Sequence, residues 1–174
     1  RQAFVRLDFQ PFHPSFIMTL LFTLHVGGRR AISAGLDTIL HDISLVKPTH
    51  ISGTTLFWSI LQREFNHRVQ TEISSGCPRE EAAERAGAEL RSELGGKIYE
   101  AVSGGAPLPH SLAEFVKKVL RIELVDLFGC REAGGIARNG AVHPGVKVRL
   151  LPVEELGADY DGTQRGDICV RPTS

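Results

Sequence analysis

The chain has 174 residues, of which 42% are hydrophobic and 23% are charged, as expected of a soluble globular domain with a sizeable core. Lysine plus arginine equals aspartate plus glutamate at 20 each, which excludes the basic excess of proteins that bind nucleic acid or anionic membranes. The longest apolar run, residues 16–24, is far too short for a membrane-spanning helix. Three separated cysteines form neither a metal motif nor a disulfide framework, so we expect a reducing, cytoplasmic location.

The first third of the chain predicts alternating strands and helices. Residues 4–9 alternate apolar and polar side chains, as a half-buried strand does. Residues 16–26 predict a buried helix that two glycines close, and residues 36–45 space their leucines and isoleucines at a helical period. Short strands are predicted at residues 30–33 and 49–53.

The middle of the chain predicts two long helices, followed by two strands that each lead into a glycine turn. Thr54 or Thr55 could cap the first helix. The second, residues 79–94, is amphipathic, and its charges are most simply a solvated face. Strands at residues 97–102 and 123–128 flank a helix at 111–120. Such turns form ligand sites at the carboxyl ends of parallel strands.

The fold class that these elements predict is α/β, with a mostly parallel sheet flanked by helices. The last quarter predicts short strands at residues 146–151 and 167–171, a small antiparallel addition at the C-terminal end. We therefore expect an α/β subdomain for nucleotide and acyl binding at residues 1–133. A short β-rich segment at residues 134–174 would begin the next subdomain.

Five motifs in order carry a family resemblance. "SGGAPLP" at residues 103–109 is similar to the adenine-side loop of the adenylate-forming enzymes, which include acyl-CoA synthetases, luciferases and peptide-synthetase adenylation domains. "LFGCREAG" at residues 127–134 resembles the Tyr-Gly-x-Thr-Glu segment that follows that loop. Residues 88–108 are most similar to carboxylic acid reductases and long-chain acyl-CoA synthetases. The other motifs are residues 9–33, 45–53 and, as closing strands, 143–155 with 165–172.

The resemblance implies ATP-dependent activation of a carboxylic acid such as a fatty acid. The carboxylate would attack the α-phosphorus of ATP, giving acyl-AMP and pyrophosphate, before transfer to CoA, a carrier-protein thiol or a reductase. By position in the motifs, the AMP cradle would comprise Ser103, Gly104, Gly105, Ala106, Pro107, Asp126, Phe128 and Gly129. Glu132 would hold Mg²⁺, Arg131 would face the phosphate, and His13 would position the acyl carboxylate.

Several of these positions have a simpler interpretation or differ from the family pattern. Arg131 stands where the family has Thr, Phe128 replaces Tyr, and His13 comes one residue before the expected position. An arginine can still bind phosphate as a bidentate donor. Glu132 could instead be an ordinary carboxylate after a turn. By family position, Thr54, Phe57 and Trp58 could line the acyl pocket, although their helical spacing is also typical of core residues.

The sequence contains no counterpart of the family's Ser/Thr/Gly-rich phosphate loop or of the domain that carries its catalytic lysine. We therefore expect an internal fragment that does not catalyse alone, and whose exposed sheet edges favour self-association. One alternative is a degenerate, non-catalytic adenylation fold kept for ligand binding or assembly. Another is an unrelated flavodoxin-like regulator, against which the five ordered motifs argue.

Overall fold

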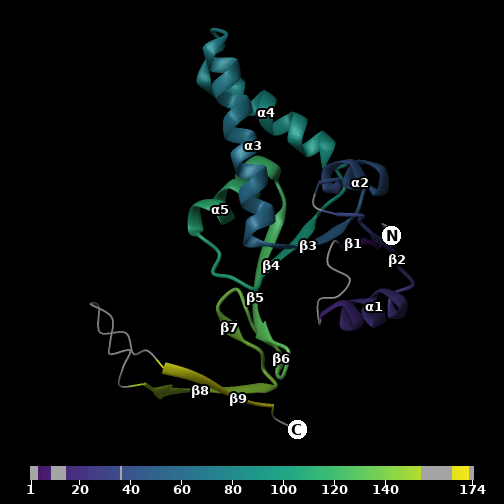
Figure 1. The fold of residues 1–174 in the computed structure, drawn as a ribbon, viewed down its shortest axis with the longest axis vertical. Coiled ribbons are helices and arrows are strands. Elements are labelled where there is room, and N and C mark those ends of the chain that lie inside the picture. The colour runs from purple at the N-terminus through teal and green to yellow at the C-terminus, as the bar shows by residue number, and fades with distance from the viewer. Residues whose placement is uncertain (1–3, 9–14, 36, 154–165, 173–174) are drawn as a thin grey trace. The chain divides into compact units, whose positions relative to one another are not determined.

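The computed structural model describes residues 4–8, 15–35, 37–153 and 166–172, and Figure 1 shows their fold. The chain divides into two compact units, Arg1–Asp126 and Leu127–Ser174. The predicted boundary after residue 133 stays a prediction. His13 lies outside the described residues.

The first unit alternates strands and helices and contains most of a parallel sheet. Strand β1 pairs in parallel with β2 and with β3, and β3 pairs in parallel with β4, which confirms the α/β prediction. The strands follow the order β2-β1-β3-β4-β5. The elements are β1 (Val5–Asp8), α1 (Ser15–His25), β2 (Arg29–Ile32), α2 (Ile39–Val46), β3 (His50–Thr54), α3 (Thr55–Ser74), α4 (Arg79–Glu93), β4 (Glu100–Gly104), α5 (His110–Phe115), the π-helix η1 (Val116–Leu120) and β5 (Glu123–Cys130), which continues into the second unit.

One face of this sheet carries the hydrophobic core. Leu7, Ile51 and Ala101 are register partners across β1, β3 and β4, and each is at most 1% exposed. Burial of an aliphatic side chain stabilises the folded state by about 1.5–3 kcal/mol. The helices α2, α3, α4 and α5 supply the other side of this core, including Ile43, Trp58, Leu61, Leu90 and Leu112.

The expectation of a buried helix at residues 16–26 is wrong. A helix, α1, does form there, on the other side of the sheet from α2 and α3 (Figure 1). However, Ile17, Leu21 and Leu24 are 66%, 56% and 65% exposed, whereas Thr23 is buried. Hydropathy reports how apolar a helix is, but not how much surface the sheet offers to cover it.

Buried charges attach α1 to the sheet. The Nη1 of Arg30 donates to the carbonyl of Phe16 at 2.9 Å, and its guanidinium stacks 3.7 Å from the centroid of the Phe16 ring. Its Nε lies 2.8 Å from the Oδ2 of Asp8, an ion pair without hydrogen-bond geometry. Arg6 pairs with the other oxygen of Asp8 at 3.2 Å and donates to the hydroxyl of Ser52. Sequence reasoning missed this cluster.

The charged face of α4 is open to solvent, as predicted, and it also pairs with charges on α3, which was not predicted. Arg68 on α3 lies 2.9 Å from Glu64 and 2.8 Å from Glu93 on α4. Hydrogen bonds to Glu93 raise the pKa of Arg68 above its usual value, so the guanidinium stays charged. Between the same two helices, Val69 and Ala82 form a small separate apolar cluster with Ala86.

Three local details differ from the predicted elements. The predicted helix at residues 111–120 is α-helical only to Phe115, after which η1 takes over, and Arg121 ends it with φ of 59°. Thr54 occupies the N-cap position of α3, but its hydroxyl makes no capping hydrogen bond. β4 begins at Glu100 rather than at residue 97.

The second unit is antiparallel. The end of β5 pairs with β6 (Gly134–Arg138), which pairs with β7 (Ala141–Val142). A separate two-stranded ribbon joins β8 (Val146–Pro152) to β9 (Gly166–Pro172) and confirms the antiparallel strands predicted there. Within the described residues of both units, no helix has the length and apolar character that crossing a membrane requires.

The packing of α2 in the core leads to a prediction about stability. Replacing Ile43, which is 0% exposed, by alanine should lower the free energy of unfolding by about 2–5 kcal/mol because it removes buried methyl groups and leaves a cavity. Leu45→Ala in the same helix is the matched control, since Leu45 is 68% exposed and should change stability by no more than about 0.5 kcal/mol. Urea denaturation followed by circular dichroism measures both; equal effects would contradict the packing of α2.

Candidate nucleotide site

The first predicted site segment begins at the end of β4. Ser103 and Gly104 are the last two residues of this strand and pair with Gly53 and Thr54 of β3. Ser103 is 0% exposed, and its hydroxyl has no hydrogen-bond partner among the described residues. A buried hydroxyl without a partner is costly, and it marks a place where a ligand or water completes the structure.

The chain leaves the sheet at Gly105. Its φ is 82°, a conformation that glycine adopts without strain, and the space where a side chain would project is open. Ala106 and Pro107 follow on the surface. Their carbonyls share the single hydroxyl donor of Thr55, at 3.3 and 3.5 Å, so the loop is attached to the first turn of α3. The backbone at Gly105 is therefore open to a flat ligand.

Packing beneath this loop places Phe57 and Trp58 in the core. Phe57 is 2% exposed and Trp58 is 0% exposed, as the core interpretation of their spacing predicted. A side chain at Gly53 would overlap Phe57 and would come within 3.2 Å of the Nε1 of Trp58. This Nε1 also lacks a partner among the described atoms. Neither Thr55 nor Gly53 was predicted as a site residue, although the Gly-Thr-Thr sequence after a strand carries the signal.

The second predicted segment runs along β5 and its hairpin with β6. Asp126, partly buried, ends the first unit, and in the second unit Phe128 is 49% exposed. The register of the two strands shifts between Phe128 and Gly129. A side chain at Gly129 would fall on the carbonyl oxygen of Gly134, so only glycine allows the strands to approach so closely.

Arg131 and Glu132 lie in the turn of this hairpin, and both are exposed. Their charged groups are therefore open to a ligand from solvent. The described residues contain no cluster of three metal-ligating side chains. Mg²⁺ bound with a nucleotide needs only one or two carboxylates, because phosphates and water supply its other ligands. A single exposed carboxylate such as Glu132 fits that chemistry.

The chain as a whole matches a known protein family. The model of the family described as "AMP-binding enzyme" matches residues 10–173. The chain belongs to the AMP-binding enzyme family. This membership agrees with the resemblance in the sequence and with the mostly parallel α/β fold.

Proteins similar in sequence to this chain include carboxylic acid reductases and acyl-CoA synthetases. The carboxylic acid reductase of Mycobacterium tuberculosis is 30% identical over 91% of this chain and 15% of its own length. Long chain acyl-CoA synthetase 2 of Arabidopsis thaliana is 25% identical over 78% of this chain and 26% of its length. The chain thus spans well under a third of these relatives.

Solved structures agree with the fold. The adenylation domain of a carboxylate reductase from Mycobacterium chelonae superposes with a TM-score of 0.85 at 29% identity, over 98% of this chain and 28% of that one. The corresponding domain from Segniliparus rugosus, in complex with AMP and a co-purified carboxylic acid, gives 0.78 at 31% identity, over 96% of this chain and 27% of that one.

The close approach at Gly129 makes a local stability prediction. Gly129→Ala should destabilise the β5–β6 hairpin by about 1–3 kcal/mol, because the added methyl group has no space beside the Gly134 carbonyl. Gly135→Ala is the control, since its nearest neighbour would be 3.7 Å away. Hydrogen exchange of the hairpin amides measures the difference. Equal protection in the two variants would argue against the tight pairing.

Proposed function

We propose that the chain is the central part of an enzyme that activates a carboxylic acid with ATP, forming acyl-AMP and pyrophosphate. The observation that carries this proposal is the loop of residues 103–107. It places an open, positive-φ glycine next to a buried hydroxyl without a partner, at the carboxyl end of a parallel strand. Family membership and the AMP in the Segniliparus rugosus structure support the same reading.

In the proposed site the backbone of Gly104, Gly105, Ala106 and Pro107 lies against the adenine plane, and Ser103 begins the loop. Phe128, half exposed, offers a ring for stacking, and Asp126 offers a polar group beside the base. Gly129 has no side chain, so the backbone before the hairpin turn leaves room for the nucleotide. These residues bind and orient the nucleotide, and catalysis rests mainly on positioning and charge neutralisation.

Charges in the hairpin turn act on the phosphates in this proposal. Arg131 donates to phosphate oxygens and opposes the negative charge that builds as the substrate carboxylate attacks the α-phosphorus. Glu132 would hold Mg²⁺, which when bound neutralises phosphate charge. His13, outside the described residues, would position the acyl carboxylate, which displaces pyrophosphate from the α-phosphorus.

The activated acid then passes to a thiol or a reductase. The names of the relatives, carboxylic acid reductase and long chain acyl-CoA synthetase, support a reductase domain or CoA as the acceptor. A carrier-protein thiol is the third acceptor in this proposal, which places the reaction in fatty acid metabolism in the cytoplasm. Because those relatives are several times longer, we infer that this chain works within a larger protein and does not catalyse by itself.

The nucleotide role is testable by calorimetry on this chain. A non-hydrolysable acyl-AMP mimic should bind to the chain. Gly105→Val should weaken this binding at least about tenfold, because the valine side chain strains the loop and covers the backbone on which adenine would lie. ATP with Mg²⁺ should bind more weakly to Glu132→Ala. Glu123→Ala is the control, because Glu123 is an exposed carboxylate at the start of β5, the strand that leads into the turn with Glu132.

The absence of mimic binding to this chain and to a longer protein containing it would favour the non-catalytic module instead. A loss of ATP affinity equal in the Glu132 and Glu123 variants would remove Glu132 from the proposed metal site. A mimic that binds with the same affinity to Gly105→Val would contradict the proposal that adenine lies against the loop backbone.

We also propose that the chain self-associates. Strand β2 lies at one edge of the sheet, and the neighbouring helix α1 exposes Ile17, Leu21 and Leu24. A large exposed apolar surface beside an open strand edge favours contact with another chain. In a longer protein, another segment that packs against the apolar side of α1 would likewise shield it from solvent.

Light scattering checks this second proposal. The chain should elute as a dimer or larger species at about 100 μM, and Leu21→Glu should shift it towards the monomer because a buried charge opposes association. Leu45→Glu, on the exposed side of α2, is the control and should leave the mass unchanged. A monomeric wild-type chain would contradict the proposal.

A further inference from the structure

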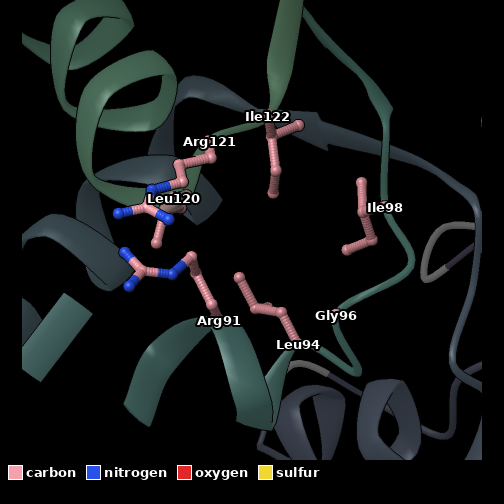
Figure 2. Close-up of a pocket in the computed structure, with 7 residues that line it drawn as sticks. All are labelled: Arg91, Leu94, Gly96, Ile98, Leu120, Arg121 and Ile122. Carbon is pink, nitrogen blue, oxygen red and sulfur yellow. The ribbon is translucent and has the colours of Figure 1, made fainter. Parts of the chain in front are cut away.

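A small pocket lies at the end of the sheet opposite the nucleotide loop. Its volume is about 240 Å³, and Figure 2 shows its lining residues. Leu94 and Ile98 approach it from the end of α4 and from the segment before β4, while Leu120 and Ile122 approach it from the connection between η1 and β5. The floor is therefore aliphatic, and the remaining lining residues are Gly96, Arg91 and Arg121.

Two arginines with one exposed carboxylate between them form the edge of this pocket. Figure 2 shows the guanidinium groups of Arg91 and Arg121 on the same side of the hollow. Glu84 lies 2.7 Å from the Nη2 of Arg91 and 3.3 Å from the Nη2 of Arg121. The Arg91 side chain is 20% exposed, whereas those of Arg121 and Glu84 are 65% and 66% exposed. The three groups carry a net charge of +1.

The local backbone holds these groups in place. The Nη1 of Arg91 donates to the carbonyl of Val119 at 2.7 Å, and a side chain at Gly87 would come within 3.1 Å of this nitrogen. The π-helix η1 ends at Arg121, whose φ of 59° costs energy in a residue with a side chain. π-Helical turns are rare in proteins overall, but many of those that occur lie at functional sites. The geometry thus brings Arg121 to Arg91 at the expense of local strain.

The charge around the pocket favours an anion. Lys97, between two lining residues, and Lys117 on η1 are both exposed. The carbonyl ends of α4 and η1 oppose an anion, but each acts as only about half a charge, and the Val119 carbonyl is already bonded to Arg91. Glu84 is held by exposed ion pairs, which are worth only about 0.2–1 kcal/mol. A ligand carboxylate can therefore take its place.

We propose that this pocket binds an aliphatic monocarboxylate of about four to eight carbons, with its carboxylate on Arg91 and Arg121 and its chain on the aliphatic floor. The volume is below that of a typical drug-sized site, which suits so small a ligand. This site lies before β4, whereas the nucleotide loop follows it, so the strand's length of about 16 Å separates them. It is a second acid site, and it does not depend on the proposed adenylation chemistry.

The test is a titration of methyl-labelled protein with sodium hexanoate, followed by NMR. The methyl signals of Leu94, Ile98, Leu120 and Ile122 should shift together and saturate below about 10 mM, whereas hexanol and hexylamine should bind at least about tenfold more weakly. An excess of the acyl-AMP mimic should leave these shifts unchanged, so failure here and failure of the nucleotide site are separate results.

Matched variants test the arginines and the exchange with Glu84. Arg121→Met should weaken hexanoate binding about tenfold or more, because it removes a charged contact and keeps the aliphatic stem. Glu84→Gln should tighten it a few-fold by removing the internal competitor. Arg85→Met and Glu81→Gln, an ion pair on the same helix outside the pocket, should change nothing.

Unshifted pocket methyls at about 10 mM hexanoate, or equal shifts with hexanol, would overturn the proposal. It would also be overturned by an Arg121→Met protein that stays folded and binds with unchanged affinity, or by weaker binding to Glu84→Gln.

Discussion

Burial of one sheet face beneath four helices sets the register of β1, β3 and β4. Leu7, Ile51 and Ala101 all point into this core, and a slip of one residue would turn Arg6 and Ser52 into it instead. Since these strands are parallel and held in register, their carboxyl ends meet along one edge. That edge brings the loop after β4 to the first turn of α3, where Thr55 holds it.

The opposite face of the sheet is held by a cluster of charged side chains. Asp8, Arg6 and Arg30 carry a net positive charge in a place where each side chain is 8–12% exposed. Removal of one partner from such a cluster is costly because it leaves another charge buried and uncompensated. The cluster therefore specifies how α1 sits, through Phe16, more than it adds to stability. Polar attachment of this kind leaves the apolar side of α1 free for another surface.

The sequence predicted what local periodicity encodes. The spacing of Ile39 and Ile43 located α2, and the glycines after β4 located the turn. Exposure of Leu21 could not be predicted, because it depends on which surfaces the sheet offers. The pairing of Asp8 with Arg30 joins residues 22 positions apart, although alternating charges in a strand of a parallel sheet are a usable signal. The site roles of Arg131 and Glu132 came from motif resemblance, and the fold adds only their exposed place in a turn.

The π-helical turn at Val116–Leu120 also bears on how the neighbouring pair of Arg91 and Arg121 could arise during evolution. A π turn differs from an α turn by one extra residue in the same hydrogen-bonded ring, so a single codon inserted into an ordinary helix can create it. The wider π ring takes up the extra residue locally, so side chains near the turn change direction while the rest of the chain keeps its place. One genetic event can therefore carry an arginine from a solvent-facing position to a neighbour's side, while the buried strand that follows keeps its place in the sheet.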